Sequence, residues 1–199
     1  MSQSDQILAL AKHQRLLRAA DVRERGWSPQ LLLSLCQAGK LQRVSRGLYS
    51  LPGIDIGEHQ TLAEVCHRVP KAVLCLLTAL QFHGVGTQAP HEVWIALPEG
   101  TRTPSMDYPP LRVARLRGDA YSEGIETVTQ QGATIRVYSV AKTVTDCFKF
   151  RHKIGLDVAL EALKDAWRSR RVTMDDLSHF ARVNRVERAM QPYLEAVTA

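Results

Sequence analysis

Amide, hydroxyl and basic side chains gather between residues 28 and 49 in a pattern that could recognise DNA. At about 100° per residue, Gln30, Ser34 and Gln37 fall on one side of a helix, where they could hydrogen-bond base edges. Basic side chains follow them and could reach phosphates or a narrow minor groove. The candidate DNA-binding residues are Ser28, Gln30, Ser34, Gln37, Lys40, Arg43, Arg46 and Tyr49.

A short helix must position the amide and hydroxyl groups. Ser28 is a favourable N-cap, Pro29 suits the first helical position, and Gly39 can adopt the left-handed conformation that ends a helix. These residues predict a helix over 29–38. Its apolar side would pack against the rest of the domain and consists of Leu31, Leu32, Leu35 and Cys36.

A hairpin must position the basic side chains. Residues 41–44 and 48–51 alternate apolar and polar side chains, and Ser45-Arg46-Gly47 between them can form a turn. Upstream, the pattern predicts helices over 5–13 and 19–25 joined by an extended link over 16–18. Three helices followed by a basic hairpin are typical of a winged helix-turn-helix, although any small αβ unit can expose polar residues in this way.

The remaining sequence predicts a second domain, so that the whole fold is α+β. Turn residues over 53–57 indicate a linker between a DNA-binding domain over 1–52 and a mixed α/β domain over 58–199 with a small sheet and a helical C-terminus. The apolar patterns that support this domain are strand-like or helical. Helices are expected over 58–69, 78–83, 156–168, 174–181 and 186–196 and from Ser139 onward, with strands over 72–76, 92–97, 111–116, 124–128 and 134–138.

Composition and charge narrow the class of protein. The 199 residues are 45% hydrophobic and 23% charged, as in ordinary globular chains. Residues 1–52 hold eight basic and three acidic side chains of a chain whose formal net charge is +6, which indicates a polyanionic partner. With neither a signal-peptide pattern nor an apolar run of about 18 residues, we expect a cytoplasmic protein without a membrane partner.

The reactive residues predict no catalytic, metal or cofactor site. The four cysteines are scattered in apolar surroundings, which indicates buried free thiols. Cys147 lies near Asp146 and His152, but it falls on the apolar side of its helix, where a thiolate is unfavourable. Lys142 and Asp146 are four residues apart and are expected to pair weakly on the helix surface. His83 is expected at a helix C-terminus rather than on a metal.

The chain resembles the AbiEi-type antitoxins, a family of transcriptional regulators. Residues 16–52 are similar to the family's winged-helix domain, through the segments Ala19–Gly26, Leu31–Leu35, Gly39–Val44 and Arg46–Tyr49. Three later blocks, over 77–84, 138–150 and 154–163, are similar to its C-terminal domain. The resemblance implies an autorepressor that binds repeats in its own operon promoter. It also implies an antitoxin that opposes a neighbouring nucleotidyltransferase-like toxin in abortive phage infection, in a functional opposition that does not require a stable complex.

The predicted recognition helix departs from the family pattern in its low arginine content. Many members carry more arginine on the recognition helix, so we expect Lys40, Arg43 and Arg46 to supply most of the phosphate contacts here.

Arg168, Arg170 and Arg171 form either a solvated surface or a second basic patch that contacts DNA, RNA or the toxin. The alternatives to an antitoxin are a C-terminal enzyme or nucleotide-binding domain that the DNA-binding domain targets, and a regulator without a toxin partner.

Overall fold

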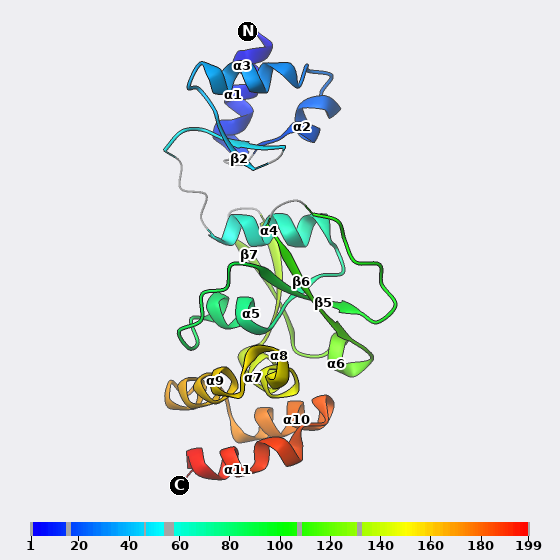
Figure 1. Ribbon diagram of the computed structural model, residues 1–199, viewed down its shortest axis with the longest axis vertical. Coiled ribbons are helices and arrows are strands. Elements are labelled where there is room, and N and C mark those ends of the chain that lie inside the picture. Colours follow the sequence, from blue (N-terminus) through cyan, green and yellow to red (C-terminus); the bar gives the residue numbers. More distant parts are fainter. Residues whose placement is uncertain are drawn as a thin grey trace. The chain divides into compact units, whose positions relative to one another are not determined.

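The computed structural model describes residues 2–14, 17–45, 47–53, 58–106, 109–130 and 133–198. The fold mixes helices with two small sheets (Figure 1). The chain divides into two compact units, the N-terminal unit Met1–Thr61 and the C-terminal unit Leu62–Ala199. Most of the predicted linker, residues 54–57, lies outside the described residues, so the domain limits drawn from the sequence stay a prediction.

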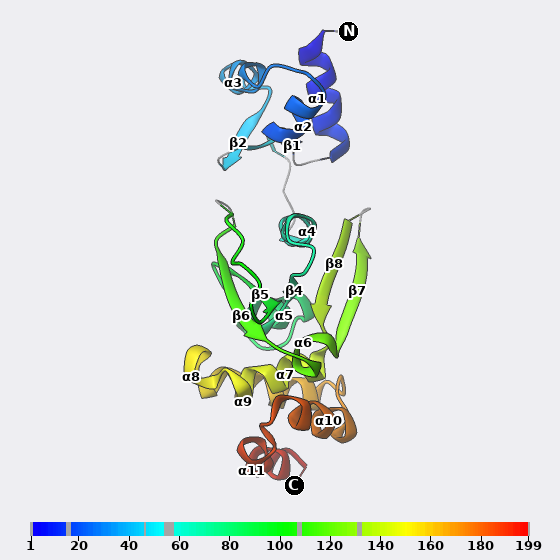
Figure 2. The ribbon, with the colours of Figure 1, turned by 90° about the vertical axis from the view of Figure 1, so that its right-hand side faces the viewer.

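The N-terminal unit packs three helices on a three-stranded sheet (Figure 2). Its elements are α1 (Gln3–Gln14), β1 (Leu17–Arg18), α2 (Ala19–Glu24), α3 (Gln30–Gln37), β2 (Gln42–Ser45) and β3 (Leu48–Ser50). The strand order is β1-β3-β2, and both pairs are antiparallel. The expected hairpin is therefore present as β2 and β3. β1, which was expected only as an extended link, adds a third strand to the sheet. Leu17 of β1 lies opposite Tyr49 of β3.

A single apolar cluster holds the N-terminal unit together. It draws one or two side chains from most of the elements, which is the pattern of an amphipathic helix or strand that buries one face. The buried members are Ile7, Ala11, Leu17, Val22, Leu32, Leu35, Leu41 and Tyr49. Burying a large apolar side chain contributes about 1.5–3 kcal/mol, so these contacts position α3 against the sheet.

The C-terminal unit is built on a mixed five-stranded sheet with the order β6-β5-β4-β8-β7. Its strands are β4 (Val73–Leu74), β5 (Val93–Pro98), β6 (Leu111–Leu116), β7 (Ile125–Gln130) and β8 (Ala133–Tyr138). β4 pairs antiparallel with β5 and parallel with β8, while β5 pairs parallel with β6 and β7 pairs antiparallel with β8. All five strands were expected from the sequence, to within a few residues.

Helices cover both faces of this sheet (Figure 2). One face carries α4 (Glu58–Arg68). Neighbouring strand residues alternate between the two faces: Leu74 belongs to the apolar cluster that includes Leu62 and Val65 of α4, and Val73 belongs to the apolar cluster on the opposite face. The opposite side holds the larger cluster, to which α5 (Leu76–His83), α7 (Val140–Lys149), α9 (Leu156–Arg168), α10 (Met174–Asn184) and α11 (Glu187–Thr198) contribute. The short helices α6 (Asp119–Ser122) and α8 (Arg151–Ile154) were not expected.

Two helices of the C-terminal unit begin with side-chain caps. The Ser139 hydroxyl accepts a hydrogen bond from the Lys142 backbone N–H at 3.4 Å, which caps α7. Thr173 and Asp176 form a reciprocal capping box at the start of α10, with the Asp176 N–H donating to the Thr173 hydroxyl at 3.1 Å. These local contacts place the starts of α7 and α10.

Candidate nucleic-acid interface

Helix α3 begins with backbone contacts rather than with the expected side-chain cap. The Leu31 N–H donates to the Ser28 carbonyl at 3.1 Å, and Pro29 already has helical angles, φ −62° and ψ −19°. Within the described residues the Ser28 hydroxyl makes no hydrogen bond to the first turn of α3. The prediction that the Ser28 side chain caps this helix is therefore wrong. The Ser28 side chain is exposed and remains open to an outside partner.

The other end of α3 follows the expected termination. Gly39 has φ +66°, and the N–H groups of Lys40 and Leu41 both donate to the Leu35 carbonyl, at 2.9 and 3.1 Å. Glycine adopts this left-handed conformation without steric strain. The chain therefore turns directly from α3 into β2, with Lys40 exposed at the turn.

The predicted polar face of α3 is exposed. Gln30, Ser34 and Gln37 are accessible, as is Leu33 at 52%, whereas Leu32 and Leu35 are buried. The Ser34 hydroxyl donates to the Gln30 carbonyl at 3.0 Å, so its oxygen lone pairs stay available as acceptors. The helix thus presents two amide groups and one hydroxyl outward over two turns.

Two exposed basic side chains follow α3 in the sequence. Lys40 and Arg43 are exposed, and Arg43 lies on β2 opposite Tyr49, where the β2–β3 register shifts between Arg43 and Ser45. Burial raises the pKa of the Cys36 thiol on α3, and the nearby Arg43 guanidinium opposes that rise. Arg43 is therefore within electrostatic range of Cys36, on the side of α3 that packs against the apolar cluster. Arg46 lies outside the described residues, so its place in the hairpin stays a prediction.

Tyr49 is a correction to the candidate set. Its side chain is only 6% exposed and belongs to the apolar cluster of the N-terminal unit. β3 is the central strand of the sheet, and the Tyr49 side chain belongs to the same buried cluster as Ile7 of α1 and Leu32 and Leu35 of α3. The side chain stabilises the sheet that carries Arg43 and is not a surface contact for DNA.

The three arginines at the C-terminal end of α9 and just beyond it have different surroundings. Arg168 and Arg170 border a small cavity of about 400 Å³ together with Trp167 and Val172. Arg171 instead donates from its guanidinium to the His83 carbonyl at the end of α5. A second basic patch here stays a prediction. His83 itself contacts the Tyr138 carbonyl at 2.7 Å.

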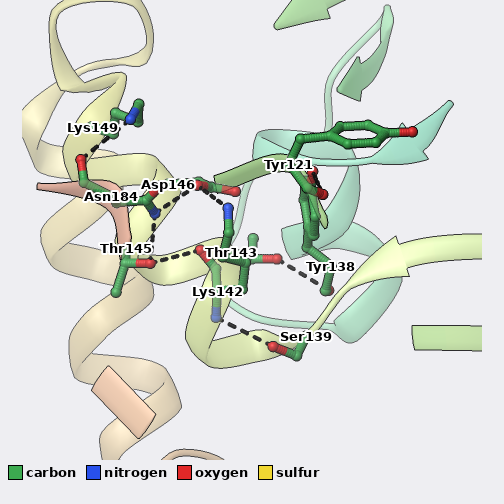
Figure 3. A network of polar contacts seen from close by, with 9 residues as sticks. All are labelled: Tyr121, Tyr138, Ser139, Lys142, Thr143, Thr145, Asp146, Lys149 and Asn184. Carbon is green, nitrogen blue, oxygen red and sulfur yellow. Dashed lines mark hydrogen bonds and ion pairs between the residues drawn. The ribbon is translucent and has the colours of Figure 1, made fainter. Parts of the chain in front are cut away.

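The Cys147 region contains a buried polar network instead of a surface pair (Figure 3). Lys142 Nζ and Asp146 Oδ1 are 2.5 Å apart, and their side chains are 0% and 1% exposed, so the expectation of a weak surface pair is wrong. Asn184 Nδ2 donates to the same Asp146 oxygen at 2.7 Å. The pair is buried because α5, α9 and α10 all pack around α7.

Cys147 is not placed for nucleophilic chemistry. Its thiol is fully buried, and burial raises its pKa well above the ordinary value of 9.0. His152 is exposed on α8 and so does not share the buried surroundings of the thiol. In the described parts of the chain, no group of three or more His, Cys, Asp or Glu side chains could hold a metal ion. No described helix is long and apolar enough to cross a bilayer.

Comparison with known proteins supports the sequence resemblance over the N-terminal unit. Residues 5–52 match the model of a family described as a transcriptional regulator, AbiEi antitoxin, which confirms the resemblance for those residues. No curated protein sequence matches the chain. The fold is similar to the crystal structure of the RV2827C protein from Mycobacterium tuberculosis, with a TM-score of 0.65 and 14% identity over 90% of this chain and 71% of that one.

Proposed function

We propose that this protein is a sequence-specific DNA-binding transcriptional autorepressor whose N-terminal unit is a winged helix-turn-helix. The observation that carries the proposal is the exposed polar face of α3 beside the basic turn and strand at Lys40 and Arg43. These features lie within the residues that match the family of antitoxin transcriptional regulators. The proposed domain limits are 1–52 for the DNA-binding domain, 53–57 for the linker and 58–199 for the second domain.

In this proposal α3 reads bases and the hairpin contacts the backbone. An eight-residue helix is about 12 Å long, which suits the width of the major groove. Gln30 and Gln37 can each make paired hydrogen bonds to adenine, and Ser34 can accept or donate. Lys40, Arg43 and Arg46 contact phosphates through charge-assisted hydrogen bonds, which fix register and orientation without reading sequence.

The proposal extends to a role as the antitoxin of a toxin pair. The family match supports a regulator that is also an antitoxin. The finer proposal is a cytoplasmic protein that binds repeats in its own promoter and counteracts a nucleotidyltransferase-like toxin during phage infection. The opposition to the toxin is functional and needs no stable complex between the two proteins.

Two measurements test these two roles separately. Fluorescence anisotropy with the DNA upstream of the gene should show binding much tighter than to a scrambled duplex of equal length, because base contacts add to the non-specific phosphate contacts. Equal affinity for both duplexes would contradict sequence-specific repression. Co-expression with the neighbouring open reading frame should restore growth if that frame encodes the toxin, and continued growth arrest would contradict the antitoxin role.

A further inference from the structure

A second concentration of positive charge lies in the C-terminal unit, around a cavity of about 730 Å³. The cavity is bordered by the end of β6, by α6, and by the C-terminal ends of α7 and α10, and α10 packs against both α6 and α7. Five basic side chains and two carboxylates line it. They are Arg115, Arg117, Lys149, Arg182 and Arg185, with Glu99 and Asp119.

The fold brings these cations together from three distant parts of the sequence. Lys149 is the last residue of α7, and Arg182 lies in the last turn of α10. Arg185 ends α10 in the left-handed conformation, φ 57°, an unusual state for a residue other than glycine, and its N–H donates to the Arg182 carbonyl at 2.9 Å. Lys149, Arg182 and Arg185 therefore line the cavity from the C-terminal ends of α7 and α10.

The positive charge at this cavity is only weakly compensated. Arg117 approaches Glu99 at 4.0 Å, but both side chains are largely exposed, so this pair contributes little. Among the residues that the structure describes, Arg182 and Arg185 have no ion-pair partner. Like charges at this density repel each other, so the cavity favours a ligand with several negative charges.

Lys149 is positioned at this cavity by the buried network (Figure 3). Its ammonium donates to the Asn184 carbonyl at 3.2 Å, and the Asn184 side chain is held by Asp146 and by Thr145, at 2.7 and 2.9 Å. Burial lowers the pKa of Lys149. The Asp146 carboxylate opposes that shift, whereas Lys142, Arg185 and Arg117 add to it. A bound anion would offset the repulsion that these cations exert on one another.

Apolar side chains complete the lining and indicate which anion fits. Leu116 and Ala120 are buried beside the cations, and Val183 is half-buried between Arg182 and Asn184. The cavity volume falls within the range of small-molecule sites, about 300–1,000 Å³. A hollow of this size suits a small molecule better than a DNA duplex, which needs an extended surface. We propose that this cavity binds a nucleoside di- or triphosphate, with the phosphates on Lys149, Arg182 and Arg185 and the nucleoside against Val183 and the aliphatic parts of the surrounding arginine side chains.

Calorimetric titration of the full-length protein with ATP, GTP and inorganic tripolyphosphate tests this proposal. We expect at least one nucleotide to bind, and we expect the double variant Arg182→Ala, Arg185→Asn to weaken that binding by about tenfold or more, since charged contacts are lost. Asparagine is chosen because it tolerates the left-handed conformation. The matched control is Arg188→Ala, an exposed arginine on α11 outside the cavity, which should bind as the wild type does.

The possible outcomes separate this site from the DNA interface. The variant Lys40→Ala, Arg43→Ala should keep nucleotide binding, because its changes lie in the other unit. Thermal melting checks that each variant is folded. The proposal would be overturned if neither ATP nor GTP bound, or if the folded variant Arg182→Ala, Arg185→Asn bound nucleotide with unchanged affinity. Tripolyphosphate binding as tightly as ATP would overturn the nucleoside contact, and loss of DNA affinity instead of nucleotide affinity would assign the cavity to nucleic acid.

Discussion

At the scale of single residues, the pair Lys142 and Asp146 combines an unfavourable location with favourable geometry. Both side chains are buried, yet Lys142 Nζ is 2.5 Å from Asp146 Oδ1 and 4.2 Å from the centroid of the Tyr138 ring. Desolvation costs each charge several kcal/mol, which the partner offsets only while both are present. The pair is therefore sensitive to the loss of either member.

Replacing Lys142 with methionine should destabilise the protein strongly. Methionine keeps most of the side-chain volume but leaves the Asp146 carboxylate buried without its cation, at a cost of about 3–5 kcal/mol in the free energy of unfolding. Urea unfolding at neutral pH measures the change. The double variant Lys142→Met, Asp146→Asn should recover part of the loss, because it removes the stranded charge. A loss below about 1 kcal/mol in the single variant would contradict the buried pair.

The same variant should show a characteristic dependence on pH. Burial raises the pKa of Asp146 above its ordinary value of 3.8, and Lys142 opposes the rise, so its removal raises that pKa further. The folded state then holds a proton that the unfolded state has already released, and stability falls as pH rises from 3.8 through the folded pKa. Lys142→Met should therefore lie closer to wild type at about pH 5 than at about pH 8. A constant difference would contradict this assignment.

Gly124 is a second residue whose type is dictated by a close approach. It has φ +73°, and an added Cβ would lie 2.8 Å from Lys142 Cβ and 3.0 Å from a Phe180 ring carbon. Gly124→Ala should therefore lower the free energy of unfolding by about 2–4 kcal/mol. Gly84→Ala is the matched control, because Gly84 has φ +61° with open space around it and incurs only the backbone strain of about 1–2 kcal/mol. Equal losses would contradict the close packing at Gly124.

At the scale of elements, regular periodicity made most of the fold predictable. β6 over 111–116 and α9 over 156–168 have the expected bounds, because their side chains alternate at a strand or helix period for several residues. β1 pairs with β3 through only two residues, and α6 and α8 span four each, so none of them has a measurable period.

The candidate sites were less predictable than the elements. The exposed face of α3 followed from its own sequence, but the burial of Tyr49 depends on β1, a strand brought in from elsewhere in the chain. The burial of Lys142 depends likewise on α9 and α10, which follow it in the sequence. The spacing of Lys142 and Asp146 indicated that they could pair, and only the packing of distant helices determines that they do so inside the core.

The hairpin strand β2 should contribute affinity without sequence preference. Arg43→Ala should weaken binding to the upstream DNA and to unrelated duplexes by similar factors, and should reduce the salt slope of binding by about one unit, as expected for one lost phosphate contact. Anisotropy titrations at several salt concentrations provide this slope. Arg188→Ala serves as the control for a change of net charge elsewhere. An unchanged slope in Arg43→Ala would remove β2 from the interface.

Helix α3 should instead contribute sequence preference. Gln37→Ala removes an exposed amide that can pair with a base edge, so it should reduce discrimination among operator variants by roughly 1–3 kcal/mol while leaving the salt slope unchanged. Competition titrations with single-base operator variants measure this discrimination. An equal loss of affinity on every sequence would show that Gln37 contacts only the backbone.

At the scale of the whole molecule, the two units have separate apolar clusters. Among the residues that the structure describes, the N-terminal cluster ends at Leu51, and both clusters of the C-terminal unit begin at or after Leu62. Each unit therefore has its own source of hydrophobic stabilisation, which is the physical condition for independent folding. The exposed polar face of α3 and the basic cavity also lie in different units, so the proposed DNA binding and the proposed anion binding can be tested one at a time.

A fragment spanning residues 58–199 should fold alone and lose specific DNA binding. It retains both clusters of the C-terminal unit and the complete five-stranded sheet, but none of the proposed DNA contacts on α3 and β2. We expect a cooperative thermal transition, and an affinity for the upstream DNA at least about 100-fold below that of the full chain, since only non-specific phosphate contacts remain. Circular dichroism and anisotropy measure the two properties. A folded fragment that binds the upstream DNA as tightly as the full chain would move the DNA interface into the C-terminal unit, whereas a fragment without a cooperative transition would show that the units depend on each other for folding.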